Sequence, residues 1–108
     1  MSYKVEVTFY FKRQAKRLKK KFPSLKTELE KLISIFEQQP EQGTAIGNSC
    51  YKIRFGIASK GKGKSGGARI ITHVQIVKSK VYLISIYDKS EQHDISEKEL
   101  ELLLKLIP

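Results

Sequence analysis

Several features that other protein classes need are scarce or absent in this chain of 108 residues. It has one cysteine, Cys50, so an internal disulfide and a cysteine-based zinc cluster are both excluded. No apolar stretch approaches the length that spans a membrane, and residues 1–7 lack the apolar core of a signal peptide. We therefore expect a cytoplasmic protein in which the thiol is a small buried side chain rather than a catalytic group.

Acidic residues are missing from a long central part of the sequence. Between Gln42 and Tyr87 there are 46 residues without Asp or Glu, and eight of them are Lys or Arg. Residues 1–22 hold eight cations and one acid, whereas residues 88–108 hold three cations and six acids. The net charge of +10 is thus segregated, which indicates a positive face and a polyanionic partner such as a nucleic acid backbone.

The length and the 40% hydrophobic content fit one folded domain over residues 1–108 with a modest core. Alternation predicts a strand at residues 3–8, and a helix follows it. The apolar stripe of this helix has spacings of four, three and four: Phe11, Ala15, Leu18 and Phe22. The chain breaks at Pro23, and Ser24 is placed to cap a second helix that stops before Pro40.

Three strands are predicted after a polar connection at residues 42–49. They cover residues 50–57, 69–77 and 81–87, with a hairpin turn between the last two and an apolar final strand inside the sheet. If the helices cover one face of a mainly antiparallel sheet, alternation brings four side chains together on the open face. These are Lys52, Arg54, Arg69 and His73.

A terminal helix closes the chain. Ser96 and Glu99 form a capping box at its start. Its core stripe is Leu100, Leu103, Leu104 and Ile107, and two further leucines widen this apolar face. The fold class is therefore α+β.

Residues 59–69 form a loop rich in glycine and lysine between two of the predicted strands. Three lysines recur at every second position, and a planar guanidinium suited to phosphate follows: Lys60, Lys62, Lys64 and Arg69. The loop matches nucleotide-binding fingerprints only in part, because a strand rather than a helix follows it. We favour phosphate binding over the alternative of a solvated hairpin loop that prevents edge aggregation.

The two histidines give weaker signals. His73 lies on a predicted strand, where structural and phosphate-contacting roles are both open. His93 lies in an acidic turn, Asp88–Asp94, and can pair with its neighbours. Two isolated histidines do not make a metal site.

The order of elements, together with cations on the sheet, resembles the RelE/HigB superfamily of bacterial type II toxin–antitoxin toxins, which cleave mRNA on the ribosome. The resemblance is sharpest from Cys50 to Ile95, and the segments 58–64 and 86–91 are similar to its HigB2-like branch. It implies the RelE-like microbial RNase fold: an N-terminal strand, a helical hairpin, a three-stranded mainly antiparallel sheet and a C-terminal helix. It also implies two partners, mRNA on the ribosome and a cognate antitoxin protein, with no cofactor and no metal.

The resemblance also implies roles for individual residues. The expected catalytic residues are Lys52, Arg54, Lys64 and Arg69, and the expected RNA-binding residues are Lys60, Lys62, His73 and Lys89. Ser90 and Ser96 stand where RelE has an arginine and a tyrosine, so the proton-transfer groups are left open. Two alternatives remain: a non-catalytic RNA- or ribosome-binding module of the same fold, and a ParE-like gyrase poison.

Overall fold

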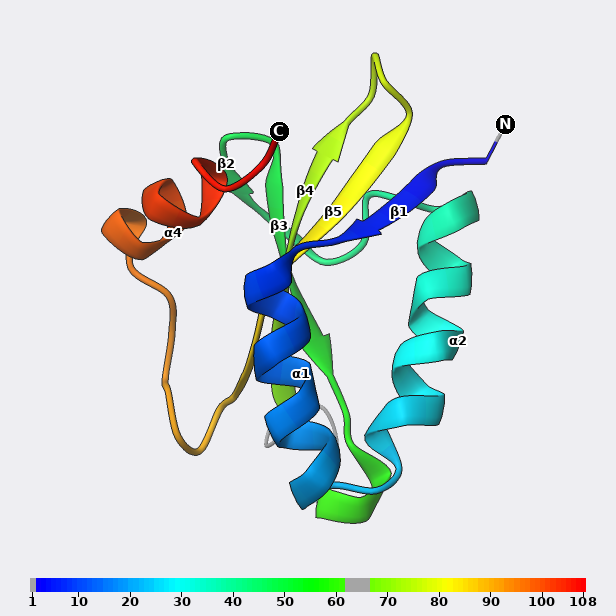
Figure 1. Ribbon diagram of the computed structural model, residues 1–108, viewed down its shortest axis with the longest axis vertical. Helices are drawn as coiled ribbons and strands as arrows, with labels where there is room; N and C mark the ends of the chain where they lie inside the picture. Colours follow the sequence, from blue (N-terminus) through cyan, green and yellow to red (C-terminus); the bar gives the residue numbers. More distant parts are fainter. Residues whose placement is uncertain (1, 62–66) are drawn as a thin grey trace.

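Helices cover both faces of a mixed sheet in the computed structural model, which describes residues 2–61 and 67–108 (Figure 1). The elements, in chain order, are β1 (Lys4–Val7), α1 (Phe9–Lys21), α2 (Leu25–Gln38), β2 (Thr44–Gly47), β3 (Cys50–Phe55), η1 (Ala58–Lys60), β4 (Ala68–Gln75), β5 (Lys80–Asp88) and α4 (Glu97–Leu104). The predicted α+β class and the predicted order of helices and strands are confirmed.

The sheet in the described residues has five strands in the order β1-β5-β4-β3-β2. The predicted N-terminal strand joins the three predicted strands in this sheet, and β2 is the additional fifth strand. The N-terminal strand β1 joins the sheet parallel to β5, and the other pairs are antiparallel. Strand β5 lies inside the sheet, between β1 and β4, as its apolar sequence predicts.

Strand β2 corrects the expectation that residues 42–49 are only a connection. Gly47 pairs with Cys50, so Asn48 and Ser49 alone form the turn between β2 and β3. Both turn residues have positive φ, 55° and 59°, as a tight type I′ hairpin requires. Asn tolerates this conformation well. The turn pairs the short, mostly exposed strand β2 with β3.

Helices α1 and α2 pack on one face of the sheet. The predicted stripe of α1 is buried there against Ile53, Ile70 and Leu83. Leu25, Leu29 and Phe36 of α2 are buried in the same core. Thr8 caps α1, since its side-chain oxygen accepts a hydrogen bond from the Phe11 N–H at 3.2 Å. None of the helices in the described part of the chain is long and apolar enough to cross a membrane.

Ser24 does not cap α2, contrary to the sequence prediction. Its backbone is already helical, with φ −72° and ψ −15°. Its hydroxyl group instead lies 2.8 Å from Glu28 Oε1 and 2.8 Å from Ser59 Oγ. Ser24 therefore joins the start of α2 to η1.

The second face of the sheet is half covered, whereas the sequence predicted an open face. Helix α4 begins at the predicted cap, where Ser96 Oγ accepts a hydrogen bond from the Glu99 N–H at 3.1 Å. Leu100 and Leu103 of this helix pack on a second core that includes Ile71 and Tyr82. The part of this face that α4 leaves uncovered carries the basic side chains described next.

Candidate functional site

Three strands contribute one row of side chains across the second face of the sheet. Arg54 of β3 pairs in register with Arg69 of β4, and Arg69 pairs with Tyr87 of β5. Lys52 lies two residues before Arg54, so period-two alternation places it on the same face. The neighbouring positions Ile53 and Ile70 point the other way, into the core beneath α1 and α2.

These side chains line a pocket of about 470 Å³. Its lining residues come from β2, β3, β4 and the segment that follows β5: Thr44, Lys52, Arg54, Arg69, Lys89, His93 and Asp94. Four of these are Lys or Arg and one is an acid. Such an excess of convergent donors suits a ligand with several anionic oxygens.

The two arginines of the row differ in exposure. Arg54 is exposed, whereas Arg69 is 4% exposed. Arg69 Nη1 donates a hydrogen bond to the carbonyl oxygen of Ala68 at 3.1 Å, which holds the guanidinium beside its own strand. The buried guanidinium of Arg69 has a fixed position and can contact one atom of a ligand. The exposed side chain of Arg54 can adjust its position along an extended ligand.

Asp94 is the acid of the pocket, and its Oδ1 accepts hydrogen bonds from three groups. These are Lys52 Nζ at 3.1 Å, the Tyr87 hydroxyl at 3.4 Å and the Ile95 N–H at 2.8 Å. The hydrogen bonds from Ile95 and Lys52 lower the pKa of Asp94. Burial, with the negative charge and hydrogen bond of Asp94 adding to it, raises the pKa of Tyr87 to about 12. Asp94 is therefore an anion in direct contact with Lys52.

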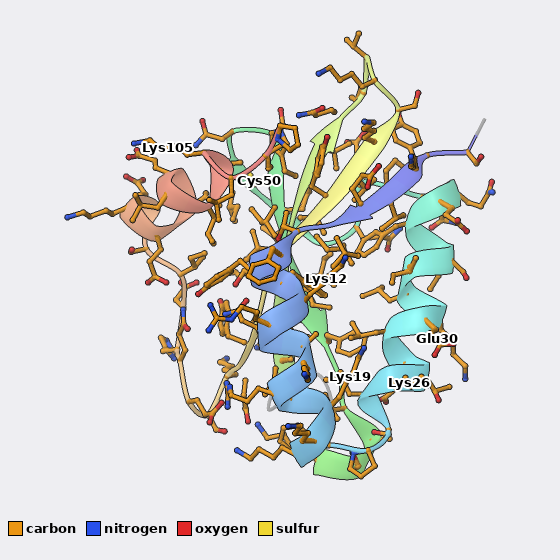
Figure 2. All side chains as sticks on the ribbon, viewed as in Figure 1. Lys12, Lys19, Lys26, Glu30, Cys50 and Lys105 are labelled. Atoms are coloured by element: carbon orange, nitrogen blue, oxygen red, sulfur yellow. The ribbon has the colours of Figure 1, made fainter. Side chains whose placement is uncertain are left out.

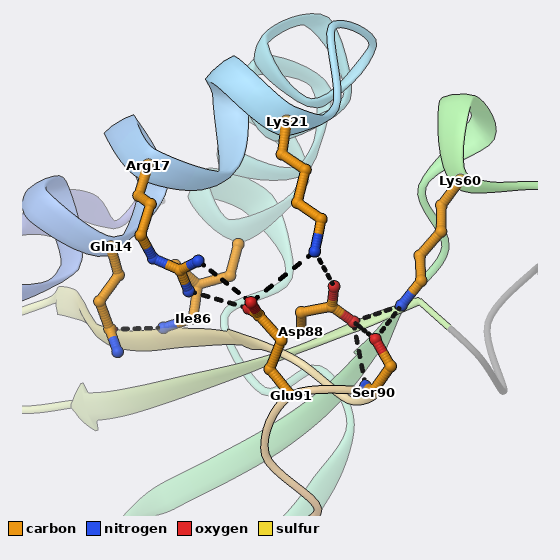
Figure 3. Close-up of polar contacts among 8 residues, drawn as sticks. All are labelled: Gln14, Arg17, Lys21, Lys60, Ile86, Asp88, Ser90 and Glu91. Atoms are coloured by element: carbon orange, nitrogen blue, oxygen red, sulfur yellow. Dashed lines mark hydrogen bonds and ion pairs between the residues drawn. The ribbon is translucent and has the colours of Figure 1, made fainter.

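Next to the pocket, a buried carboxylate organises the end of β5 (Figure 3). Asp88 is 1% exposed and forms an ion pair with Lys60. Ser90 donates to the same carboxylate through its N–H at 3.0 Å and its hydroxyl at 2.8 Å. Burial opposes the charge, but the hydrogen bonds from Lys60 and Ser90 outweigh it and lower the pKa of Asp88 to about 2.

The same cluster ties this end of β5 to α1 (Figure 3). Arg17 binds Glu91 through both of its terminal nitrogens, at 3.3 Å and 3.0 Å. Lys21 lies 3.7 Å from a carboxylate oxygen of Asp88 and 3.7 Å from one of Glu91. Two successive turns of α1 thus anchor the segment that carries Lys89 and His93 into the pocket.

The structure brings together four of the eight predicted site residues: Lys52, Arg54, Arg69 and Lys89. Lys62 and Lys64 lie outside the described residues. Lys60 was expected to present a mobile charge to RNA, but its side chain is 8% exposed and its ammonium binds Asp88 and Ser90. Its position indicates a structural role at the end of η1.

His73 is on the same face as Arg69 but not in the same pocket. It pairs in register with Cys50, and its Nδ1 lies 3.6 Å from Cys50 Sγ. It lines a different hollow together with Leu104 and Ile107, beside the end of α4. His73 therefore lies on the same face of the sheet as the four clustered cations but lines a separate hollow.

Thr44, Tyr87 and Asp94 were not among the predicted site residues, and His93 was expected in a separate acidic turn. Thr44 lies on the unpredicted strand β2 and pairs with Lys52. Tyr87 pairs with Arg69, and the alternation of side chains along β5 could have placed it on this face. His93 and Asp94 lie in a segment without helix or strand, where local pattern gives no position. Among the described residues, no group of three or more His, Cys, Asp or Glu side chains could hold a metal ion.

A second hollow, of about 280 Å³, lies between α1 and α2 on the other face of the sheet. Apolar side chains such as Phe11 and Leu29 form its floor. Its rim carries charged side chains, as Figure 2 shows for Lys12, Lys19, Lys26 and Glu30. This hollow has no side chain in common with the cationic pocket.

Comparisons with known proteins agree with this architecture. A family model described as the RelE toxin of the RelE/RelB toxin-antitoxin system matches residues 4–107. The structure is similar to a double arginine-to-alanine mutant of the Escherichia coli toxin RelE in the free state, with a TM-score of 0.62, 20% identity and all of both chains covered. It is also similar to isolated E. coli RelE, with a TM-score of 0.59, 18% identity, and coverage of 98% of this chain and 100% of the other. The chain therefore belongs to the RelE toxin family.

Proposed function

We propose that this chain is the toxin of a type II toxin–antitoxin module and that it cleaves mRNA on the ribosome. A cognate antitoxin protein would neutralise it. The family membership supports the toxin role. The glycine- and lysine-rich segment from Ser59 to Arg69 favours the HigB2-like branch of the family.

One observation carries the proposal of RNA chemistry. Lys52, Arg54, Arg69 and Lys89 are up to 37 positions apart in sequence, yet they line one pocket. Four cations against the single acid Asp94 give the pocket an excess of positive charge, which favours binding of an anion. We propose a phosphodiester as this ligand, because its two non-bridging oxygens share one negative charge and can accept hydrogen bonds from several donors.

The reaction we propose is attack by the ribose 2′-hydroxyl on the adjacent phosphorus. A bond forms from the 2′-oxygen to phosphorus, and the bond from phosphorus to the 5′-oxygen breaks, which leaves a cyclic phosphate. Negative charge builds up on the phosphoryl oxygens in the transition state. Arg69, which is fixed beside β4, and Lys89 are placed to stabilise this charge, an effect worth about 10²–10³ in rate for a single well-placed donor.

The reaction also needs a base for the 2′-hydroxyl and an acid for the 5′-oxygen. We assign these roles to the pocket side chains that are able to exchange protons, Lys52 and His93. Arginine is unsuited to this role because it stays protonated, so Arg54 is assigned to phosphate binding. Lys64 keeps its sequence-based assignment as a charge stabiliser, and Lys62 its assignment as an RNA contact.

The test is translation of a defined message in a purified system, with new 5′ ends mapped by primer extension. Wild-type protein should produce breaks in the codon that occupies the ribosomal A site. Lys52→Ala and Lys89→Ala should each reduce cleavage by roughly 10²-fold. Lys105→Ala is the matched control, since Lys105 is exposed beyond α4 and outside the pocket, and it should cleave like wild type (Figure 2).

The alternatives give different outcomes. Stalled translation with an intact message would favour a non-catalytic ribosome-binding module. Unaffected translation with trapped gyrase cleavage complexes would favour a ParE-like poison. Circular dichroism of each variant checks that lost cleavage is not lost folding.

A further inference from the structure

Within the cationic pocket, one carboxylate lies where the phosphate of a ligand could bind. Asp94 lies in the segment between β5 and α4, and its Oδ1 contacts Lys52 Nζ at 3.1 Å and the Tyr87 hydroxyl at 3.4 Å. A phosphate oxygen bound at this position would meet the same two donors. The carboxylate therefore satisfies Lys52 in a way that a phosphate could also satisfy it.

The contact between Asp94 and Lys52 is easily broken. The side chains are 55% and 32% exposed, respectively, and exposed ion pairs contribute little to stability. Asp94 is also fixed locally by a hydrogen bond from the neighbouring Ile95 N–H at 2.8 Å. Breaking the pair thus requires no change in either core.

We propose that Asp94 is an internal counter-ion of the pocket, which pairs with Lys52 in the free protein and which a phosphate of the RNA backbone displaces. The proposal rests on the proposed function for the identity of the RNA ligand. Asp94 thereby weakens RNA binding, because the displaced carboxylate stays close to the entering phosphate and repels it. It acts on binding and does not touch the reacting atoms.

Removing the charge should therefore strengthen RNA binding. Asp94→Asn keeps the shape of the side chain and should tighten binding of a single-stranded RNA by about two- to tenfold at low salt. The gain should shrink as salt increases, because exposed charges are screened. The slope of log affinity against log salt should steepen by up to about 0.7, the value for one additional neutralised phosphate on a single strand.

The measurement is fluorescence anisotropy with a 2′-O-methyl RNA, which the pocket can bind but not cleave. Glu101→Gln is the matched control, since it makes the same change in net charge at an exposed position of α4 outside the pocket. The control should leave both affinity and salt slope unchanged. Equal affinities for wild type and Asp94→Asn, or an equal gain in the Glu101→Gln control, would overturn the proposal.

A kinetic readout separates this role from direct catalysis. On ribosomes, Asp94→Asn should lower KM, because the phosphate no longer competes with the carboxylate for Lys52. Loss of cleavage with unchanged binding would mean that Asp94 itself takes a proton, and that result would also overturn the proposal.

A third measurement depends on neither RNA nor activity. Ultraviolet titration should give a lower pKa for Tyr87 in Asp94→Asn than in wild type, where it is about 12. Tyr87→Phe identifies the contribution of this phenol among the five tyrosines. An unchanged Tyr87 pKa would rule out the contact with Asp94. Binding of inorganic phosphate is a further test that does not depend on RNA. If Asp94→Asn bound phosphate more tightly but no RNA bound, the proposed function would be wrong and the counter-ion role of Asp94 would be supported.

Discussion

Arg54 and Arg69 lie directly opposite each other in the register between β3 and β4. Like charges in this relationship destabilise a sheet, whereas opposite charges or β-branched pairs stabilise it. Arg69 is buried and Arg54 is exposed, so the repulsion acts at the edge of the pocket, where an anion would relieve it. We infer that this pair belongs to the proposed phosphate site.

Replacing Arg54 should therefore separate stability from activity. We expect Arg54→Thr to raise the free energy of unfolding by about 0.2–1 kcal/mol, because it removes the repulsion and adds a residue that suits strands. The same change should reduce mRNA cleavage by at least about tenfold. Urea denaturation and primer extension measure the two effects.

The control for this prediction is Lys78→Thr, which makes the same loss of charge in the exposed turn between β4 and β5. It should alter cleavage little. If Arg54→Thr lowered the free energy of unfolding instead, the inference that repulsion between Arg54 and Arg69 destabilises the folded protein would be wrong.

The buried carboxylate at the end of β5 predicts a defined response to acid. The pKa of Asp88 in the folded protein is about 2, below its ordinary value of 3.8, so the folded state favours the ionised form. This contribution, about 2 kcal/mol, is present above about pH 4 and is lost as the pH falls towards 2. Asp88→Asn should thus destabilise the protein at pH 7 by about this amount and flatten its acid unfolding curve.

Urea unfolding at several pH values tests this prediction. Glu101→Gln, which removes an exposed carboxylate, should leave the acid curve close to that of wild type. An Asp88→Asn variant with the wild-type pH dependence would show that the ion pair with Lys60 contributes nothing in solution.

Much of the pocket was predictable because strand periodicity acts over short distances. Once residues 50–57 and 69–77 are recognised as strands, alternation alone places Lys52, Arg54 and Arg69 on one face. The antiparallel register then brings the two arginines together. The same reasoning placed His73 on this face, but it could not show that α4 covers that end of the sheet.

Other parts depend on contacts that no local pattern encodes. Lys60 lies in a segment that reads as solvated, and its partner Asp88 is 28 residues further along the chain. Asp94 is 42 residues from Lys52, in a segment held by hydrogen bonds and ion pairs rather than by helix or strand. Such side chains are positioned by tertiary structure, so their roles became visible only with the fold.

The single thiol gives a prediction about reactivity. Cys50 is 1% exposed, and burial raises its pKa to about 11. Because the thiolate is the reactive form, a disulfide reagent at about pH 8 should label the folded protein far more slowly than the protein in urea. The label can be followed by absorbance, and Cys50→Ala gives the background. Rapid labelling of the native protein would mean that the β2–β3 hairpin opens readily.

The two histidines form a matched pair for testing where proton transfer occurs. His93 lines the cationic pocket, whereas His73 lies beside Cys50 and the end of α4. We expect His93→Gln to reduce cleavage of ribosome-bound mRNA by about 10²-fold or more, because a positioned acid or base contributes on that order. His73→Gln removes the same imidazole at a position outside the pocket and should cleave within about threefold of wild type.

The pH dependence of cleavage distinguishes a proton-transfer role for His93 from a binding role. If His93 exchanges a proton in the reaction, one limb of the profile should disappear in His93→Gln and remain in His73→Gln. A uniform reduction at every pH would assign His93 to RNA binding, and Lys52 would then be the remaining described side chain of the pocket able to act as the base. Equal losses in both variants would show that the histidines act through the stability of the protein, which thermal unfolding of the two variants would reveal.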